Sequence, residues 1–167
     1  MACGLCCDGT LFDHVNLTAE DDAAALSSVG IELLPDKFPQ VLRQRCAAYK
    51  NASCTIYRNR PHACRSFRCR LLKAYEMSDI PYSEALRIIG EAVALRDGIK
   101  RDLRALGDGE DYSFRELAVR LQTKWKDAVS VEAKDRISNL FGTFAALWMC
   151  INNHFLDQGQ REIENKR

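Results

Sequence analysis

The stretch Cys3-Gly4-Leu5-Cys6-Cys7 places three thiols within five residues, and more thiols follow downstream. Seven of the eight cysteines precede residue 70, at Cys3, Cys6, Cys7, Cys46, Cys54, Cys64 and Cys69. In a reducing compartment, clustered cysteines are more often metal ligands or catalytic groups than disulfides. We therefore predict that six of these cysteines converge on one metal site, with Cys46 as a further member.

The number of thiols exceeds what one simple centre needs. The two residues between Cys3 and Cys6 let both sulfurs reach one ion at about 2.3 Å, as in zinc sites. One tetrahedral ion, or one four-iron, four-sulfur cluster, takes only four thiolates. Three solutions stay open: a two-metal cluster with bridging sulfurs, a four-iron cluster with the other cysteines catalytic or structural, or a mixed site. The mixed site would include Asp8, His14 or His62.

Arginines accompany the downstream cysteines. Four or more thiolates on a divalent ion leave net negative charge, which neighbouring guanidinium donors can offset. Arg60 precedes Pro61 and Arg65 follows Cys64, so we predict that these two arginines contact the bound cofactor. A solvated basic face explains the other arginines equally well, at Arg58, Arg68 and Arg70.

Composition narrows the range of partners. The chain of 167 residues is 47% hydrophobic and 28% charged, which is typical of a globular protein with its own core. A net charge of +1 gives no electrostatic reason to expect nucleic acid as a partner. No secretory signal and no apolar run of about 18 residues is visible, so we expect a cytoplasmic protein without a membrane partner. The sequence does not indicate an oligomeric state.

The second half of the chain has the pattern of amphipathic helices. Apolar residues recur at three- and four-residue steps and predict helices over 83–106, from Ser113 onward and from about Val131 onward. The last of these carries Cys150 within an apolar run, so we expect Cys150 to be a core residue. The helices should pack through Leu86, Ile89, Val93, Leu117, Leu121, Phe141, Phe144 and Trp148.

The first half has weaker signals. Thr18 and the acidic residues after it predict a helix that ends near Gly30. The segment from Cys46 to Tyr57 predicts a hairpin, and Pro61 predicts the start of a helix that reaches Tyr75.

These signals predict a mainly α fold. A small irregular cysteine-rich metal-binding head at 1–77 precedes an antiparallel helical bundle at 78–158 and a charged tail at 159–167. We expect the three to form one compact unit.

The cysteine-rich half also resembles a known family. The N-terminal motif, together with the string CTIYRNRPHACRSF from Cys54 to Phe67, resembles the YkgJ-type cysteine-cluster family. This family is also called the CxxCxxCC zinc- or iron-chelating domain and is related to flagellin lysine N-methylase. The pattern C-x-I-Y-x-x-R-P-x-x-C-R-x-F within that string is specific, and the resemblance covers residues 3–70. The first cysteine of CxxCxxCC would fall before Met1, so the ligand set is either smaller or completed by another residue.

The resemblance implies chelation of iron or zinc. From it and from the excess of thiols we expect an iron or iron–sulfur enzyme that modifies a peptide, a protein or a small molecule. Iron or an iron–sulfur cluster is preferred over zinc as cofactor, with one or two zinc ions as the alternative. Oxidoreductase and methyl-transfer chemistry are both compatible, although no nucleotide-binding glycine fingerprint is present. The alternative functions are a zinc-stabilised binding or accessory module and a metal carrier without catalysis.

Overall fold

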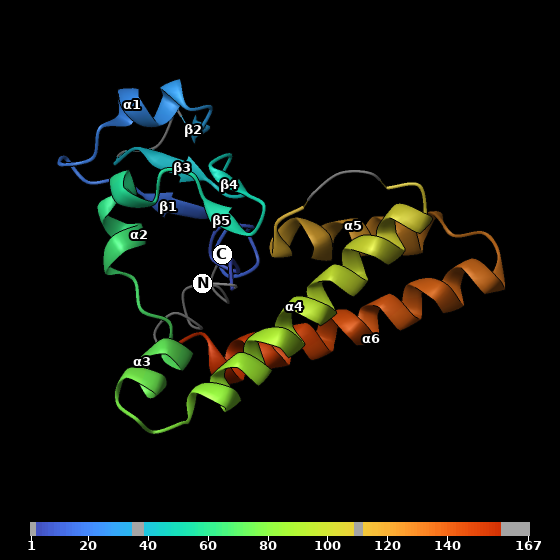
Figure 1. Cartoon of the computed structure of the whole chain (residues 1–167). Coiled ribbons are helices and arrows are strands. Elements are labelled where there is room, and N and C mark those ends of the chain that lie inside the picture. Colours follow the sequence, from blue (N-terminus) through green and yellow to red (C-terminus); the bar gives the residue numbers. More distant parts are fainter. Residues whose placement is uncertain (1–2, 35–38, 109–111, 158–167) are drawn as a thin grey trace. The chain divides into compact units, whose positions relative to one another are not determined.

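The computed structural model describes residues 3–34, 39–108 and 112–157. The chain folds into two compact units. The cysteine-rich unit holds Met1–Phe67 and Tyr112–Arg115, and the helical unit holds Arg68–Asp111 and Glu116–Arg167. The fold is mainly α, as predicted, and the strands that the structure describes all belong to the cysteine-rich unit (Figure 1). The predicted charged tail lies outside the described residues.

A three-stranded antiparallel sheet forms the frame of the cysteine-rich unit. Its order is β1-β3-β2, from the strands β1 (His14–Asn16), β3 (Val41–Arg43) and β2 (Leu33–Leu34). Leu42 in the central strand lies opposite Val15 on one side and Leu33 on the other. Three apolar residues therefore line up across the sheet, which is the arrangement that stabilises neighbouring strands.

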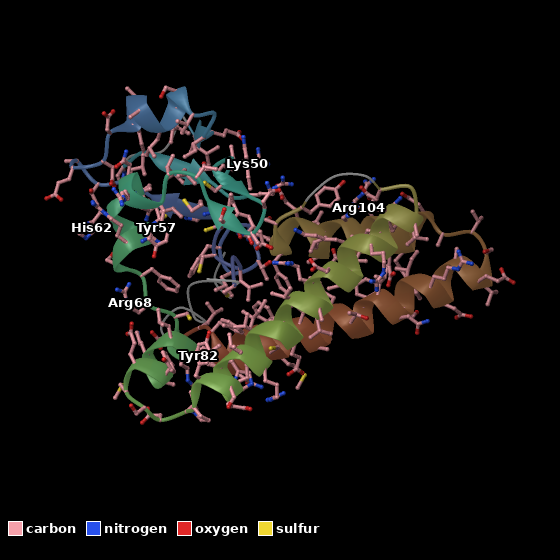
Figure 2. The ribbon with its side chains drawn as sticks, viewed as in Figure 1. Lys50, Tyr57, His62, Arg68, Tyr82 and Arg104 are labelled. Carbon is pink, nitrogen blue, oxygen red and sulfur yellow. The ribbon has the colours of Figure 1, made fainter. Side chains whose placement is uncertain are left out.

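The predicted hairpin is present. Strands β4 (Tyr49–Lys50) and β5 (Ser53–Cys54) pair with Tyr49 opposite Cys54, and Lys50 projects from the end of β4 (Figure 2). The two turn residues, Asn51 and Ala52, have positive φ angles of 50° and 58°. Two positive φ angles in a two-residue loop match the twist of the flanking strands.

The first helix is shorter than predicted. Helix α1 (Ala23–Ser28) begins after Asp22, whose carboxylate accepts the Ala25 N–H at 2.9 Å. The prediction that Thr18 caps this helix is wrong, because the Thr18 N–H instead donates to the Asp21 carboxylate in a separate turn. The helix does end next to Gly30, which has a φ of 84°, as predicted.

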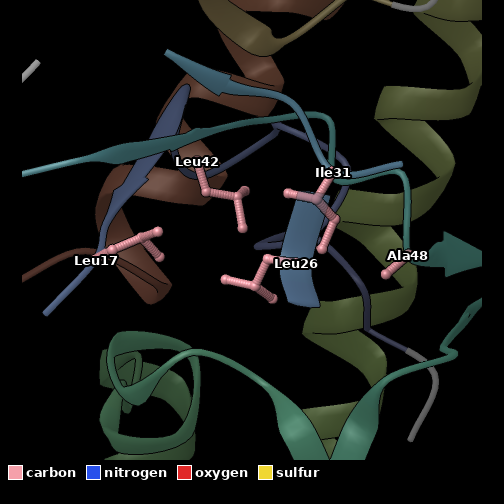
Figure 3. Packing of buried hydrophobic residues seen from close by; sticks show 5 residues of the cluster. All are labelled: Leu17, Leu26, Ile31, Leu42 and Ala48. Atoms are coloured by element: carbon pink, nitrogen blue, oxygen red, sulfur yellow. The ribbon is translucent and has the colours of Figure 1, made fainter. Parts of the chain in front are cut away.

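A small apolar core lies between α1 and the sheet. It consists of five buried residues, shown in Figure 3: Leu17, Leu26, Ile31, Leu42 and Ala48. Cys46 and Ile56 pack against it from segments on either side of the hairpin. The core thus fixes the hairpin and at least one of the predicted thiols to the same frame.

The N-terminal cysteine loop is closed by a glycine and a tyrosine. The Gly4 carbonyl accepts the N–H groups of Cys7 at 2.9 Å and Asp8 at 3.1 Å, and Leu5 is fully buried. Gly4 has a φ of 65°, and a Cβ placed on it would lie 1.8 Å from the Tyr49 hydroxyl oxygen. Only glycine allows both this backbone conformation and this contact.

The segment after Pro61 forms two helices instead of the single helix predicted. Helix α2 (His62–Ser66) follows the short 3-10 helix η1 (Tyr57–Asn59), and α3 (Arg70–Glu76) begins after Cys69. The helix is interrupted because Phe67 adopts an extended conformation and packs edge-to-face on Phe12, with ring centroids 4.9 Å apart. The local sequence after Pro61, on which the prediction of a single helix rested, gives no indication of this contact with Phe12.

Two long helices dominate the helical unit. Helices α4 (Tyr82–Ala105) and α6 (Val131–His154) pack along each other in antiparallel directions (Figure 1). Helix α5 (Phe114–Asp127) belongs to the helical unit from Glu116 onward. Its residues Leu117 and Leu121 are buried, as predicted. The carboxylate of buried Asp108, after α4, pairs with Arg120 of α5. The three predicted helices are therefore confirmed.

The buried face of α4 differs in part from the predicted one. Leu86 is 43% exposed, and Ala85 and Ala92 are buried together with Ile88, Ile99 and Leu103, which do follow the apolar spacing of the sequence. The prediction followed the large apolar side chains and overlooked the alanines. The buried face of α4 therefore includes small residues as well as large ones.

None of the described helices is long and apolar enough to cross a membrane.

Leu147 tests the packing of the helical unit. Its side chain is 0% exposed in α6, so Leu147→Ala should lower the free energy of unfolding by about 2–5 kcal/mol through lost burial and a cavity. Urea denaturation followed by circular dichroism measures the loss. Met149→Ala is the matched control, because that side chain is 62% exposed and its loss should cost less than about 0.5 kcal/mol. Equal losses would contradict the packing described.

Gly4 tests the closure of the cysteine loop. Gly4→Ala adds left-handed strain to a collision with Tyr49, so the free energy of unfolding should fall by about 2–5 kcal/mol. Gly30→Ala is the control: its φ is 84°, but no atom lies within 4 Å of the added Cβ. That variant should lose only the strain, about 1–2 kcal/mol. A loss at Gly4 no larger than at Gly30 would show that Tyr49 does not hold the loop.

Candidate metal centre

Backbone hydrogen bonds bring three cysteine-bearing segments together. The Cys46 N–H donates to the Cys7 carbonyl at 2.9 Å, which joins the N-terminal loop to the segment before the hairpin. The Tyr49 N–H donates to the Cys46 carbonyl at 2.9 Å, and Tyr49 lies opposite Cys54. Cys7, Cys46 and Cys54 are thus placed by one continuous set of backbone contacts.

The fourth thiol of this group, Cys64, comes from α2. The pKa of Cys7 is raised to about 12, mainly by burial and then by the neighbouring thiols Cys46, Cys54 and Cys64 in that order. The pKa of Cys64 is raised to about 11, mainly by burial, with Cys46 the next contribution. Burial also raises the pKa of Cys46. The charges of Cys46, Cys54 and Cys64 each act on Cys7, so the structure places these four thiols within electrostatic range of one another.

The donor set fits zinc or iron. All eight cysteines are described, and none forms a disulfide. Four half-buried thiols supply the soft ligands that zinc and iron–sulfur centres use. Among the described residues, no three Cys, His, Asp or Glu side chains are already arranged around a common point as ligands. The four thiols therefore do not form a finished coordination set in the described part of the chain.

The remaining predicted cysteine ligands lie at three other positions. Cys3 and Cys6 are partly buried on the same N-terminal loop as Cys7. Cys69 belongs to the helical unit, where its sulfur caps α3 and accepts the Leu72 N–H at 3.4 Å. Cys150 is buried in α6, as predicted for a core residue.

The candidate oxygen and nitrogen ligands differ in their surroundings. Asp8 is only 4% exposed, and its carboxylate accepts the Thr10 N–H at 3.0 Å beside Cys7. His14 is partly buried in β1. The His62 side chain is exposed on the outer side of α2 (Figure 2). Of these three residues, Asp8 is the one whose charge contributes to raising the pKa of Cys7.

The two predicted cofactor-binding arginines have different roles. The Arg60 guanidinium lies 3.7 Å above the centre of the Tyr57 ring, and its Nε donates to the Tyr57 carbonyl at 2.9 Å. Its charge lowers the pKa of Cys64, against the larger effects of burial and Cys46. Arg65 is exposed, and its charge acts on the Asp21 carboxylate. Arg60 is thus the arginine whose charge acts on a thiol of the group.

Asp21 is a residue of this region that the sequence pattern did not single out. One carboxylate oxygen accepts the His62 N–H at 2.7 Å, and the other accepts the Thr18 N–H at 2.8 Å and hydroxyl at 3.1 Å. Burial would raise the pKa of Asp21, but these hydrogen bonds lower it below its ordinary value. An acidic residue just before a helix usually caps that same helix. The local sequence therefore gives no indication that Asp21 contacts α2.

Comparison with known proteins agrees with the donor set. Residues 1–83, about half of the chain, match the family model described as "CxxCxxCC: Putative zinc- or iron-chelating domain". Searches of curated proteins and of solved structures found no match. The matched range contains the four gathered thiols together with Cys3, Cys6 and Cys69. Through residues 1–83, the chain belongs to the CxxCxxCC family of zinc- or iron-chelating domains.

Proposed function

We propose that the cysteine-rich unit holds a zinc or iron centre on the thiolates of Cys7, Cys46, Cys54 and Cys64. The observation that supports it is the burial of the Cys7 thiol against the other three. Four thiolates complete a tetrahedral site for either metal. When bound, the metal supplies the positive charge that this group lacks.

The electrostatics of the four thiols favour a bound cation. In the metal-free protein the thiols of Cys7 and Cys64 stay neutral at pH 7, because burial and their neighbours oppose ionisation. A cation among them reverses this preference, since thiolate ligands are deprotonated on binding. The guanidinium of Arg60 then offsets part of the remaining negative charge.

A second candidate is an iron–sulfur or iron enzyme that acts on a peptide, a protein or a small molecule. The observation that favours it is the presence of Cys3 and Cys6 on the same loop, beyond the four thiols that one centre needs. Extra thiols can ligate a second ion or take part in redox or methyl-transfer chemistry. A zinc-stabilised accessory module and a metal carrier are the non-catalytic alternatives.

Metal and sulfide analysis after anaerobic purification tests the proposal. We expect a stoichiometric content of zinc or iron. Visible absorption with acid-labile sulfide would establish the iron–sulfur candidate, and a colourless zinc protein would exclude it. Rapid loss of metal to a competing chelator would identify a carrier. Neither metal in the purified protein, with no binding on reconstitution, would overturn the proposal.

Cys64→Ser should lose the metal, because an alcohol binds these metals poorly and α2 carries the fourth ligand. The cysteine-rich unit should then become sensitive to protease, while most of the helix signal in circular dichroism remains. Cys150→Ser is the matched control: it also removes a thiol, but one that is buried in α6, and should keep the full metal content. Loss of metal in Cys150→Ser with retention in Cys64→Ser would reverse the assignment.

Metal binding should release protons. The pKa values of about 12 for Cys7 and about 11 for Cys64 lie above the ordinary 9.0, so both thiols give up protons when zinc binds at pH 7. The affinity should therefore rise between pH 6 and pH 8 and weaken as the pH falls. Titration calorimetry in buffers of different ionisation enthalpy counts the protons, and Cys7→Ser should release about one fewer. An affinity independent of pH would contradict thiolate ligation.

The same pKa shifts predict the opposite trend for the metal-free protein. Folded pKa values above the ordinary 9.0 mean that the stability from these neutral thiols is present below about pH 9. That stability is lost as the pH rises toward 11 and 12. Urea denaturation of the metal-free protein at pH 7 and pH 10 should therefore show the lower free energy of unfolding at pH 10.

A further inference from the structure

Asp21 connects two segments that are distant in the sequence. Its two carboxylate oxygens accept three hydrogen bonds, one from the first residue of α2 and two from Thr18. The contact to His62 spans 41 residues and is 2.7 Å long. The charge of Arg65, one turn further along α2, also acts on this carboxylate. Asp21 is thus the point at which the turn before α1 is tied to the helix that carries Cys64.

Helix α2 depends on stabilising contacts from outside the helix. Its N-cap is Pro61, which provides no side-chain hydrogen bond to the first turn. The first N–H groups of a helix have no partner within the helix and must be satisfied elsewhere. A helix of five residues also has few hydrogen bonds of its own. The position of Cys64, two residues after His62, therefore depends on contacts made from outside the helix.

We propose that Asp21 is a positioning residue of the metal centre, which fixes the first turn of α2 so that the Cys64 sulfur faces Cys7, Cys46 and Cys54. The inference rests on the proposed metal-binding function and adds to it a residue outside the cysteine and arginine motifs. Asp21 contacts no metal in this role. It acts through the backbone of His62, and the Thr18 turn supports it from the other side.

The charge of Asp21 and its position have opposite effects on metal binding. The pKa of Cys64 is raised mainly by burial, and the negative charge of Asp21 is among the smaller contributions that raise it further. If Asp21 acts mainly through its charge, removing that charge favours the Cys64 thiolate and tightens metal binding. If Asp21 acts mainly by positioning α2, removing its hydrogen bonds weakens metal binding. The sign of the change in affinity therefore separates the two.

The test compares Asp21→Asn with Asp22→Asn in the full chain. Asn keeps one oxygen acceptor, so Asp21→Asn loses the hydrogen bonds on one side of the carboxylate. Asp22→Asn is the matched control, because Asp22 is the adjacent residue and makes the same type of bond to Ala25, but at the start of α1. Zinc affinity is measured by competition with a chromophoric chelator. The visible spectrum of the cobalt-substituted protein reports the geometry of the ligands.

We expect zinc to bind about tenfold more weakly to Asp21→Asn, with a changed cobalt spectrum, and within about twofold of the wild type to Asp22→Asn. Thr18→Ala removes only the hydroxyl contact to Asp21 and should give a smaller loss of zinc affinity. This variant tests the proposal even if Asp21→Asn fails to fold. Unchanged or tighter binding in Asp21→Asn, or an equal loss in Asp22→Asn, would overturn the positioning role while leaving the proposed function intact. Failure of the wild type to bind zinc or cobalt would overturn both.

Discussion

The hydrogen bond from the Cys46 N–H to the Cys7 carbonyl is the contact on which the cysteine-rich unit depends. It fixes the N-terminal loop against the segment that leads into the hairpin, at 2.9 Å. The Tyr49 side chain packs on Gly4, and this contact joins the same loop to the hairpin a second time. Because Tyr49 lies opposite Cys54, both connections end at the same hairpin. Loop and hairpin therefore form one piece, with the thiols on it.

Holding thiols in this way has an energetic cost in the metal-free protein. Cys7, Cys46 and Cys64 are partly removed from water, and the potential charges of neighbouring thiols act on them. Ionisation of these three thiols is therefore unfavourable in the metal-free protein. In the helical unit, α4 and α6 bury apolar residues of their own. The helical unit is thus stabilised by apolar burial, whereas the cysteine-rich unit carries the thiols proposed to bind a metal ion.

Local patterns in the sequence predicted what depends on local forces. The hairpin at 49–54 and the three long helices followed from turn residues, caps and apolar spacing. The pattern failed where a distant contact decides. Phe67 leaves the helix and packs on Phe12, and α4 buries two alanines that a pattern of large apolar residues does not mark. Cysteine clustering predicted a metal site without indicating that the N-terminal loop is joined to the segment before the hairpin, which depends on the backbone contact between Cys7 and Cys46.

Asp21 shows why a site of this kind needs residues that carry no ligand chemistry. Three of the four thiols are connected by strands and a loop that hydrogen-bond to one another. Cys64 alone comes from a separate short helix, and a short helix without a side-chain N-cap is held by few contacts of its own. A metal ion tolerates only small errors in ligand position, so the least constrained ligand limits the affinity of the whole site. The carboxylate of Asp21 supplies the missing constraint, and its cost is a negative charge placed near a thiolate.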